Sequence, residues 1–190
     1  MGGTFGRKVG WGEDFMYYRM DYESPLGSIF LASDGENLIG LWFEGQKYFE
    51  ESKAREVCEK KNLPVFDQTK DWLNRYFRGE QPRITELPLS PVGSDFRQKV
   101  WRLLCEIPYG QVTTYGEIAK KVAKKLGRET MSSQAVGGAV AHNPISIIIP
   151  CHRVVGADGS LTGYAGGVEK KKKLLELESA QFVSDIKVMI

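Results

Sequence analysis

A cysteine, a histidine and an arginine follow one another at the end of an apolar run in the second half of the chain. The stretch is ISIIIPCHRVVG, from Ile145 to Gly156. A cysteine acts as a nucleophile only as its thiolate, and an adjacent base or cation makes the thiolate accessible at neutral pH. Cys151, with His152 beside it as a base, therefore predicts nucleophilic chemistry at this point of the chain.

The same stretch also has a purely structural interpretation. The run from Ile145 to Ile149 predicts a buried strand that Pro150 ends, which would place Cys151 at the exit of the strand. Neighbours on an extended chain point to opposite sides, so His152 would reach the thiol only through a turn or a bridging water. A buried cysteine beside a histidine is, taken alone, more often a packing residue than a catalytic one.

Composition excludes several classes of protein. The chain has 190 residues and 42% hydrophobic content, enough for one domain or two small ones. Its cysteines, Cys58, Cys105 and Cys151, form no C-x-x-C pair, and only two histidines accompany them, so we expect no disulfide framework, no metal and no cofactor. No apolar run approaches the roughly 18 residues of a membrane span, and the start lacks a secretion signal. A reducing cytoplasm fits best, with no membrane partner.

Composition and patterning divide the chain into four parts. Residues 1–14 are glycine-rich and aperiodic, which predicts a flexible leader. Residues 81–93 hold three prolines and no period, which predicts a linker between an N-terminal domain over 15–80 and a second domain over 94–190. Residues 1–93 carry 12 Lys and Arg against 15 Asp and Glu, and residues 94–190 carry 14 against 9. The second half is therefore mildly basic, which a solvated surface would also explain.

The first half predicts strands followed by helices. Three short runs rich in β-branched and aromatic residues, separated by turn-forming clusters, predict an antiparallel meander over residues 16–23, 27–33 and 37–44. Helical spacing follows over 48–61 and 67–79, and the second of these helices should bury Trp72 and Tyr76 before Gly79 ends it. Strands and then helices predict a small α+β unit.

The second half predicts a helix-turn-helix. A first helix carries an apolar stripe of Phe96, Val100, Trp101, Leu104 and Ile107. Thr114 and Glu117 form a capping box for the next helix, and Ser132 or Ser133 can cap a third that Pro144 ends. The third helix is nearly bare of side chains, which predicts either tight helix packing or close approach of a nucleic-acid groove.

The motifs of the second half resemble a known family when they are taken together. AVGGA, NP, IPCHRVV and GYAGG occur in that order between about Phe96 and Glu178, as in the O6-alkylguanine-DNA alkyltransferases, also called methylated-DNA–protein-cysteine methyltransferases. SPLGSIFLA in the first half is similar to the family's early strands. The resemblance implies an α+β fold: a small ribonuclease-H-like N-terminal domain of antiparallel strands plus helices, then a winged-helix (helix-turn-helix) domain with the active site.

The resemblance also implies direct DNA repair. The alkyl group of a flipped-out O6-alkylguanine would pass irreversibly to Cys151, one per chain, with O4-alkylthymine as a further candidate substrate. By resemblance, His152 relays the thiol proton through a water and Glu178 orients the histidine. Tyr115 would give a proton or hydrogen bond to the base, and Asn143 would brace the helix-turn-helix against the cysteine turn.

A second set of residues is expected, by resemblance, to contact DNA or the base. These are Gln134, Ala135, Gly137, Gly138, Arg153, Val154, Tyr164, Ala165 and Lys171. Gln134 stands where many members have an arginine that fills the gap left by the extruded nucleotide. The expected partner is double-stranded DNA carrying O6-alkylguanine, bound through its minor groove by a monomer.

Three other functions remain as alternatives to repair chemistry. A lesion-recognition protein that binds without reacting would share the winged helix, but such relatives lack the acceptor cysteine that this chain keeps at position 151. A winged-helix regulator would show sequence-dependent affinity and two half-sites. A cysteine hydrolase would turn over, whereas water does not readily remove a thioether.

Overall fold

The computed structural model describes residues 17–49, 58–60 and 62–178, which fall into two compact units. The predicted flexible leader, 1–14, lies outside the described residues. Within the described part of the chain, no helix is long and apolar enough to cross a membrane.

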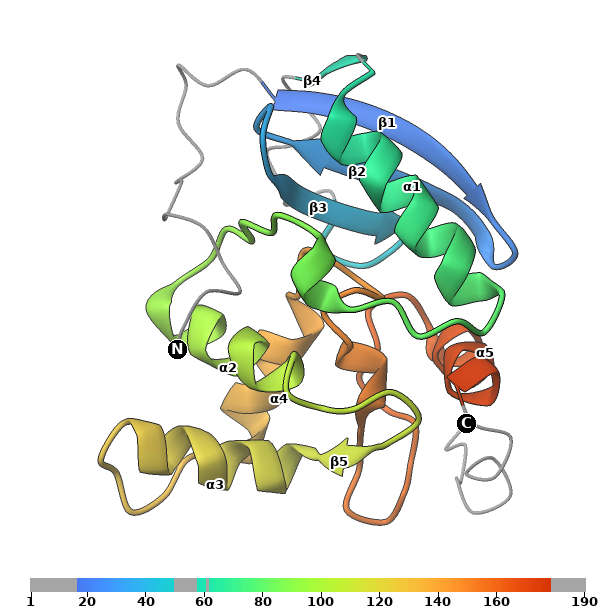
Figure 1. The fold of residues 1–190 in the computed structure, drawn as a ribbon. Coiled ribbons are helices and arrows are strands. Elements are labelled where there is room, and N and C mark those ends of the chain that lie inside the picture. The colour runs from blue at the N-terminus through green and yellow to red at the C-terminus, as the bar shows by residue number, and fades with distance from the viewer. Residues whose placement is uncertain (1–16, 50–57, 61, 179–190) are drawn as a thin grey trace. The chain divides into compact units, whose positions relative to one another are not determined.

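One short segment from the second half of the chain belongs to the first unit. The first unit comprises the described residues of Met1–Gly93 together with Pro144–Ile148, and the second those of Ser94–Asn143 with Ile149–Ile190. Strands dominate the first unit and helices the second (Figure 1). The α+β fold class predicted from the sequence is confirmed.

The sheet of the first unit has the order β3-β2-β1-β4. Its strands are β1 (Tyr17–Ser24), β2 (Gly27–Ser33), β3 (Leu38–Phe43) and β4 (Cys58–Lys60). The first three form the predicted antiparallel meander, whereas β4 pairs in parallel with β1. The helix predicted over 48–61 is wrong at Cys58–Lys60. These residues form strand β4, because pairing with Tyr17–Arg19 holds them extended. Residues 50–57 and 61 lie outside the described part.

Helix α1 (Pro64–Phe77) confirms the second helix predicted in this unit. Pro64 occupies the first turn, where its missing N–H costs no helical hydrogen bond. Trp72, Leu73 and Tyr76 are buried, and Gly79 ends the helical segment with a φ of +81° that favours glycine.

The proline-rich segment 81–93 is packed into the first unit. It contains a 3-10 turn, η2 (Ile84–Glu86), and Leu87 and Leu89 are buried. Leu38 of β3 donates its N–H to the Pro88 carbonyl at 2.8 Å, so the segment continues the pairing of the sheet edge. Proline is tolerated there because the contact uses its carbonyl and not an N–H.

The apolar run before Pro150 is buried but does not form the predicted strand. Within it, Ile145 makes a single bridge to Leu41, and the following residues turn, with Ile147 at a φ of +68°. The Ser146 hydroxyl donates to Gln46 Oε1 at 3.0 Å, which ties the turn to the loop after β3. A short apolar run cannot by itself distinguish a strand from a buried turn.

The second unit consists of helices and a two-stranded parallel ladder. The elements are α2 (Asp95–Leu104), β5 (Thr113–Thr114), α3 (Tyr115–Lys125), α4 (Ser133–Ala141), η3 (Cys151–Arg153), β6 (Val154–Val155) and α5 (Val168–Glu178). Helices α2, α3 and α4 pack on one another, and β5 pairs with β6. The Thr114 side chain caps α3 and the Ser132 side chain caps α4, as the sequence predicted.

Trp101 connects two helices of the second unit. Its side chain is fully buried, and its indole Nε1–H donates to the Ala139 carbonyl at 2.8 Å. Because Trp101 lies in α2 and Ala139 in α4, this bond fixes the depth at which α4 packs.

We expect Trp101→Phe to lower the free energy of unfolding by about 1–3 kcal/mol beyond the loss of ring area, because it leaves the buried Ala139 carbonyl without its donor. Urea denaturation would measure the change. The matched control is Trp72→Phe, whose Nε1–H bonds the carbonyl of the exposed Arg83 at 3.0 Å, where water can replace it. Equal losses in the two variants would contradict the account of α4 packing.

Candidate active site around Cys151

Cys151 begins the short 3-10 helix η3 and is 5% exposed. The backbone turns sharply here, because the Cys151 N–H donates to the Ile149 carbonyl at 2.8 Å and the Arg153 N–H to the Pro150 carbonyl at 3.1 Å. The turn replaces the extended exit expected from the sequence. A turn is one of the two ways in which His152 could serve the thiol.

Asn143 closes the loop that leads to the cysteine. Its Nδ2 donates to the Ile149 carbonyl at 2.8 Å and lies 3.1 Å from Cys151 Sγ. Burial raises the pKa of the Cys151 thiol, while the Asn143 hydrogen bond and the charge of Lys171 act in the opposite direction. The resting site therefore holds a thiol that needs a proton acceptor before it can react.

His152 and Glu178 form a buried pair. His152 Nε2 lies 2.6 Å from Glu178 Oε1, and both side chains are 0% exposed. Burial lowers the pKa of His152, and the Glu178 carboxylate only partly opposes that shift. A neutral imidazole beside an ionised carboxylate carries its proton on Nε2, so the lone pair lies on Nδ1. The pair thus has a base ready to accept a proton.

Glu178 accepts further hydrogen bonds. Arg153 Nε donates to Oε2 at 2.8 Å and Arg153 Nη2 to Oε1 at 3.0 Å, and the Gly110 N–H donates to Oε2 at 3.3 Å. Burial would raise the pKa of Glu178, but His152 and Arg153 outweigh it and hold the pKa well below its usual range. The carboxylate is therefore ionised at neutral pH.

Arg153 lies inside the second unit and not on its surface. Its side chain is 8% exposed, and its Nη1 donates to the Ile107 carbonyl at 2.7 Å. The sequence placed Arg153 among the groups that contact DNA or the base. In the structure its guanidinium is directed to Glu178 and to backbone.

Lys171 is fully buried, although it lies in a run of charged residues, 169–173. Its Nζ donates to the Val154 carbonyl at 2.5 Å and to the Thr162 carbonyl at 3.1 Å. Burial lowers the pKa of Lys171 to about 8. Lys171 therefore ties α5 to the loop that follows β6.

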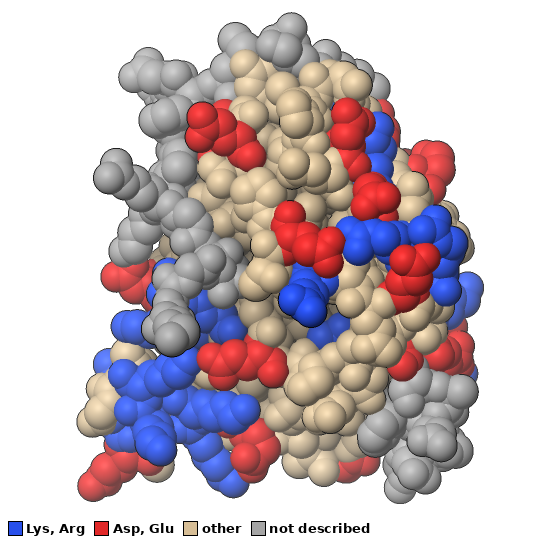
Figure 2. Space-filling view, viewed as in Figure 1, with Lys and Arg blue, Asp and Glu red and all other residues tan. Residues whose placement is uncertain are grey.

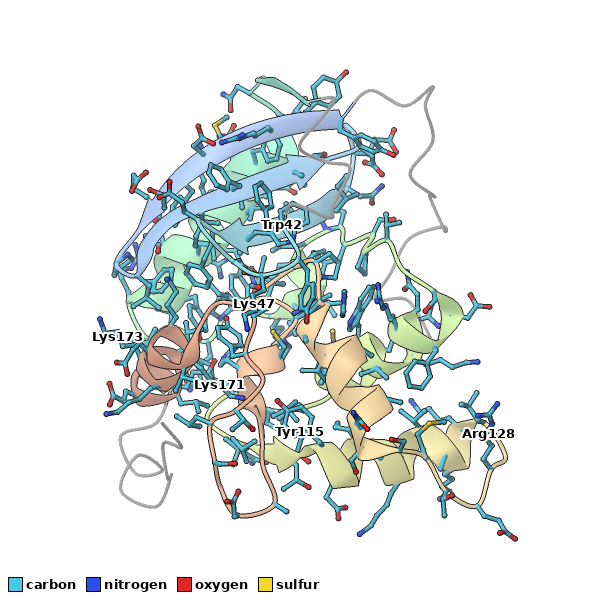
Figure 3. All side chains as sticks on the ribbon, turned by 180° about the vertical axis from the view of Figure 1, so that it is seen from behind. Trp42, Lys47, Tyr115, Arg128, Lys171 and Lys173 are labelled. Atoms are coloured by element: carbon cyan, nitrogen blue, oxygen red, sulfur yellow. The ribbon has the colours of Figure 1, made fainter. Side chains whose placement is uncertain are left out.

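Tyr115, the first residue of α3, contacts the same loop after β6. Its hydroxyl donates to the Thr162 carbonyl at 2.8 Å, and Lys171 Nζ lies 5.9 Å from its ring centre (Figure 3). Burial raises the pKa of Tyr115 to about 12. A Cβ at Gly163, which has a φ of +79°, would lie 2.7 Å from the tyrosine oxygen. Sequence reasoning missed Thr162 and Gly163, because nothing in their local pattern marks a partner 47 residues away.

The rest of the predicted base-contacting loop borders this site. Tyr164 is 7% exposed and Ala165 is half-buried. The Tyr164 carbonyl accepts from the Gly167 N–H at 3.1 Å, so the GYAGG motif forms a closed turn before α5.

Helix α4 presents an exposed face of small or uncharged residues. Gln134, Ala135 and Gly138 are exposed, and Gly137 is half-buried. A Cβ at Gly138 would meet nothing within 4 Å, and one at Gly137 would make ordinary contact with Tyr115 at 3.8 Å. Packing inside the unit therefore does not require these glycines, which favours the alternative in which a partner approaches closely.

A basic surface lies on α3 and the loop after it. Lys and Arg side chains gather at this end of the second unit (Figure 2). The exposed cations are Lys120, Lys121, Lys124, Lys125 and Arg128. Lys120 pairs with Glu117 and Lys125 with Glu106, so their charge is partly offset.

We expect Asn143→Ala to slow the reaction of Cys151 with iodoacetamide at neutral pH by roughly tenfold, because losing the amide donor raises the pKa of the thiol further. Peptide mass spectrometry would assign the adduct to Cys151. Asn74→Ala is the control, since Asn74 accepts from the Tyr22 hydroxyl in the first unit. An unchanged rate in Asn143→Ala would remove the amide from the account of thiol reactivity.

Two family models together match nearly all of the described chain. The ribonuclease-like domain of 6-O-methylguanine DNA methyltransferase matches residues 16–91, and the DNA binding domain of the same protein matches residues 95–180.

Individual relatives agree with the family models. A Haemophilus influenzae protein named methylated-DNA–protein-cysteine methyltransferase is 42% identical over 168 residues, 88% of this chain and 89% of the relative. A Methanosarcina acetivorans protein of that name is 44% identical over 167 residues, 87% and 99% of the two chains. The crystal structure of Mycobacterium tuberculosis OGT in complex with DNA is 40% identical with a TM-score of 0.71, covering 90% of this chain and 94% of that one. This chain belongs to the 6-O-methylguanine DNA methyltransferase family.

Proposed function

We propose that this protein repairs alkylated DNA directly, by moving the alkyl group from O6 of a flipped-out alkylguanine to the Cys151 sulfur, once per chain and irreversibly. The observation that carries the proposal is the buried thiol of Cys151 next to a neutral His152 bound to an ionised Glu178. The family's DNA-binding domain match, over residues 95–180, supports DNA as the partner.

The reaction begins with a proton transfer. The Cys151 thiol gives its proton, through a bridging water, to Nδ1 of His152, while the Nε2 proton stays on the hydrogen bond to Glu178. The negative charge of Glu178 stabilises the imidazolium that forms. Burial raises the pKa of the Cys151 thiol, so the thiolate forms only when His152 accepts the proton.

The thiolate then displaces the base. Its electron pair forms a bond from sulfur to the alkyl carbon, the bond from that carbon to O6 breaks, and the electrons return to the guanine ring. A proton or hydrogen bond from Tyr115 helps the base to leave as guanine. The product is a thioether, and nothing in this chemistry restores the thiol, so each chain acts once.

Base extrusion brings the target atom to the cysteine. An alkylated base costs a few kcal/mol to unstack, and the loop with Tyr164 and Ala165 would hold it after extrusion. The Ala165 amide would face O6, and the Cys151 and Val154 carbonyls would accept from the exocyclic amine. Val154 could do so while still bonded to Lys171, because a carbonyl has two lone pairs.

DNA would be bound through the minor groove by α4. The room above Gly138 supports close approach of a groove wall, and the exposed cations of α3 supply attraction for phosphates.

All groups of the relay lie in one unit of one chain, which supports a monomer. A reactive free thiol supports a reducing cytoplasm. We include O4-alkylthymine as a further candidate substrate.

Incubation with duplex DNA carrying O6-methylguanine should add one methyl group per chain, assigned to Cys151 by peptide mass spectrometry, and the reaction should then stop. Cys151→Ser should stay unmodified. Cys105→Ser should react like the parent, because burial raises the Cys105 pKa to about 12 and leaves that thiol unreactive. Tight lesion binding without a mass change would favour the non-reacting alternative, and repeated turnover would exclude the thioether mechanism.

Gln134→Arg tests the placement of α4 on DNA. If the guanidinium reaches a phosphate, a plot of the logarithm of the DNA-binding constant against the logarithm of the salt concentration should become steeper by about one unit. Gln81→Arg, which adds the same charge at an exposed position of the first unit, is the control. Identical slopes for the two variants would show that position 134 does not lie at the DNA backbone.

A further inference from the structure

Arg153 uses its guanidinium as a fork. Nε and Nη2 donate to the two oxygens of Glu178 at 2.8 and 3.0 Å, and Nη1 donates to the Ile107 carbonyl at 2.7 Å. A planar fork that binds both carboxylate oxygens fixes the plane of the carboxylate as well as its position, which a lysine ammonium cannot do.

The fork decides which oxygen faces His152. Oε1 of Glu178 receives Arg153 Nη2 and lies 2.6 Å from His152 Nε2, whereas Oε2 receives Arg153 Nε and the Gly110 N–H. The last torsion of a glutamate is intrinsically broad, so the carboxylate would otherwise have freedom to rotate. With Arg153 in place, its orientation toward the imidazole is set.

The fork is itself anchored to backbone. Ile107 and Gly110 lie at the two ends of the turn that connects α2 to β5, and Arg153 binds one end while Glu178 binds the other. Tyr109 between them donates its hydroxyl to the Leu177 carbonyl at 3.4 Å, and its ring lies 5.7 Å from the guanidinium carbon. The turn therefore holds the pair in a fixed place.

The positive charge of Arg153 makes it harder for His152 and Glu178 to take up a proton. It lowers the pKa of both Glu178 and His152. Lys171 also lowers the pKa of His152. Burial raises the pKa of Tyr109, and that of Cys105 to about 12, so these neighbours stay uncharged near neutral pH. Arg153 is the cation in direct contact with the carboxylate.

We infer that Arg153 is a positioning residue of the proton relay, which aims Glu178 at His152 and keeps the His152–Glu178 pair free of a proton so that Nδ1 can accept one. Arg153 would therefore not contact the base. This role rests on the proposed function for its natural reaction, but it also governs the intrinsic reactivity of the Cys151 thiol.

The test compares the full chain with Arg153→Met, Arg153→Lys and the control Arg78→Met, which removes an exposed arginine of the first unit. Single-turnover methyl transfer from O6-methylguanine DNA is measured between about pH 5.5 and 9. Iodoacetamide alkylation of Cys151 without DNA is followed over the same range. Thermal unfolding and affinity for undamaged DNA are recorded for each variant.

In Arg153→Met the acid limb of both rate profiles should move to higher pH by roughly one to two units, because a pair without the cation takes up its inhibitory proton more readily. Arg153→Lys should keep the acid limb near that of the parent, since the charge remains, but its plateau rate should fall several-fold, since the fork is gone. Undamaged-DNA affinity should be unchanged in both, and Arg78→Met should match the parent.

An Arg153→Met profile that falls in rate with an unshifted acid limb would show a merely structural role and overturn the inference. If Arg153→Met does not fold, Arg153→Lys decides: a plateau equal to that of the parent would overturn the positioning role. Should the parent fail to take methyl groups from DNA, the proposed function fails, but the iodoacetamide profiles still test Arg153.

Discussion

A carboxylate placed beyond the reach of water must find hydrogen-bond donors inside the protein, and the second unit is arranged around that requirement at Glu178. Desolvating one such ion costs several kcal/mol unless donors and a counter-charge replace the water. The donors come from η3 and from the turn after α2, which lie far apart in sequence. Satisfying Glu178 therefore fixes the end of α5, the turn before β5 and the ring of His152 together.

A second set of bonds connects the loop after β6 with α3 and α5. The Thr162 carbonyl accepts from Tyr115 at the start of α3 and from Lys171 in α5. Gly163 beside it leaves space for the tyrosine hydroxyl. The loop that would receive the base is thus fixed between two helices, while Asn143 at the end of α4 touches the thiol. Groups that would bind DNA and groups that would react share one framework.

Local patterns predicted the elements that depend on local chemistry. The apolar spacing of α1 and α2 and the caps Thr114 and Ser132 could be read from a few neighbouring residues. Strand β4 could not, because pairing with β1 overrides its helical spacing. The run Ile145–Ile149 was predicted correctly as buried and wrongly as a strand, since Ser146 bonds to Leu41 of β3 and to Gln46, about 100 residues earlier.

The residue types of the site could be predicted from the sequence, but the burial of its charged side chains could not. Cys151 and His152 are adjacent, so the sequence singled them out, whereas the roles of Glu178 and Tyr115 came only from resemblance. Arg153 and Lys171 were placed at the DNA or the base by resemblance, and local pattern gave no sign that both side chains are buried. Their burial follows from acceptors 25 and 17 residues away, which no local pattern reveals.

The proposed relay requires that His152 rests as a neutral imidazole with its proton on Nε2, so that Nδ1 can accept the thiol proton. Nitrogen-15 NMR of histidine-labelled protein measures this directly, with His152→Gln assigning the signal. Near pH 8 a protonated Nε2 and a pyridine-like Nδ1 are expected, because burial lowers the pKa of His152. A resting imidazolium, or a proton on Nδ1, would contradict it.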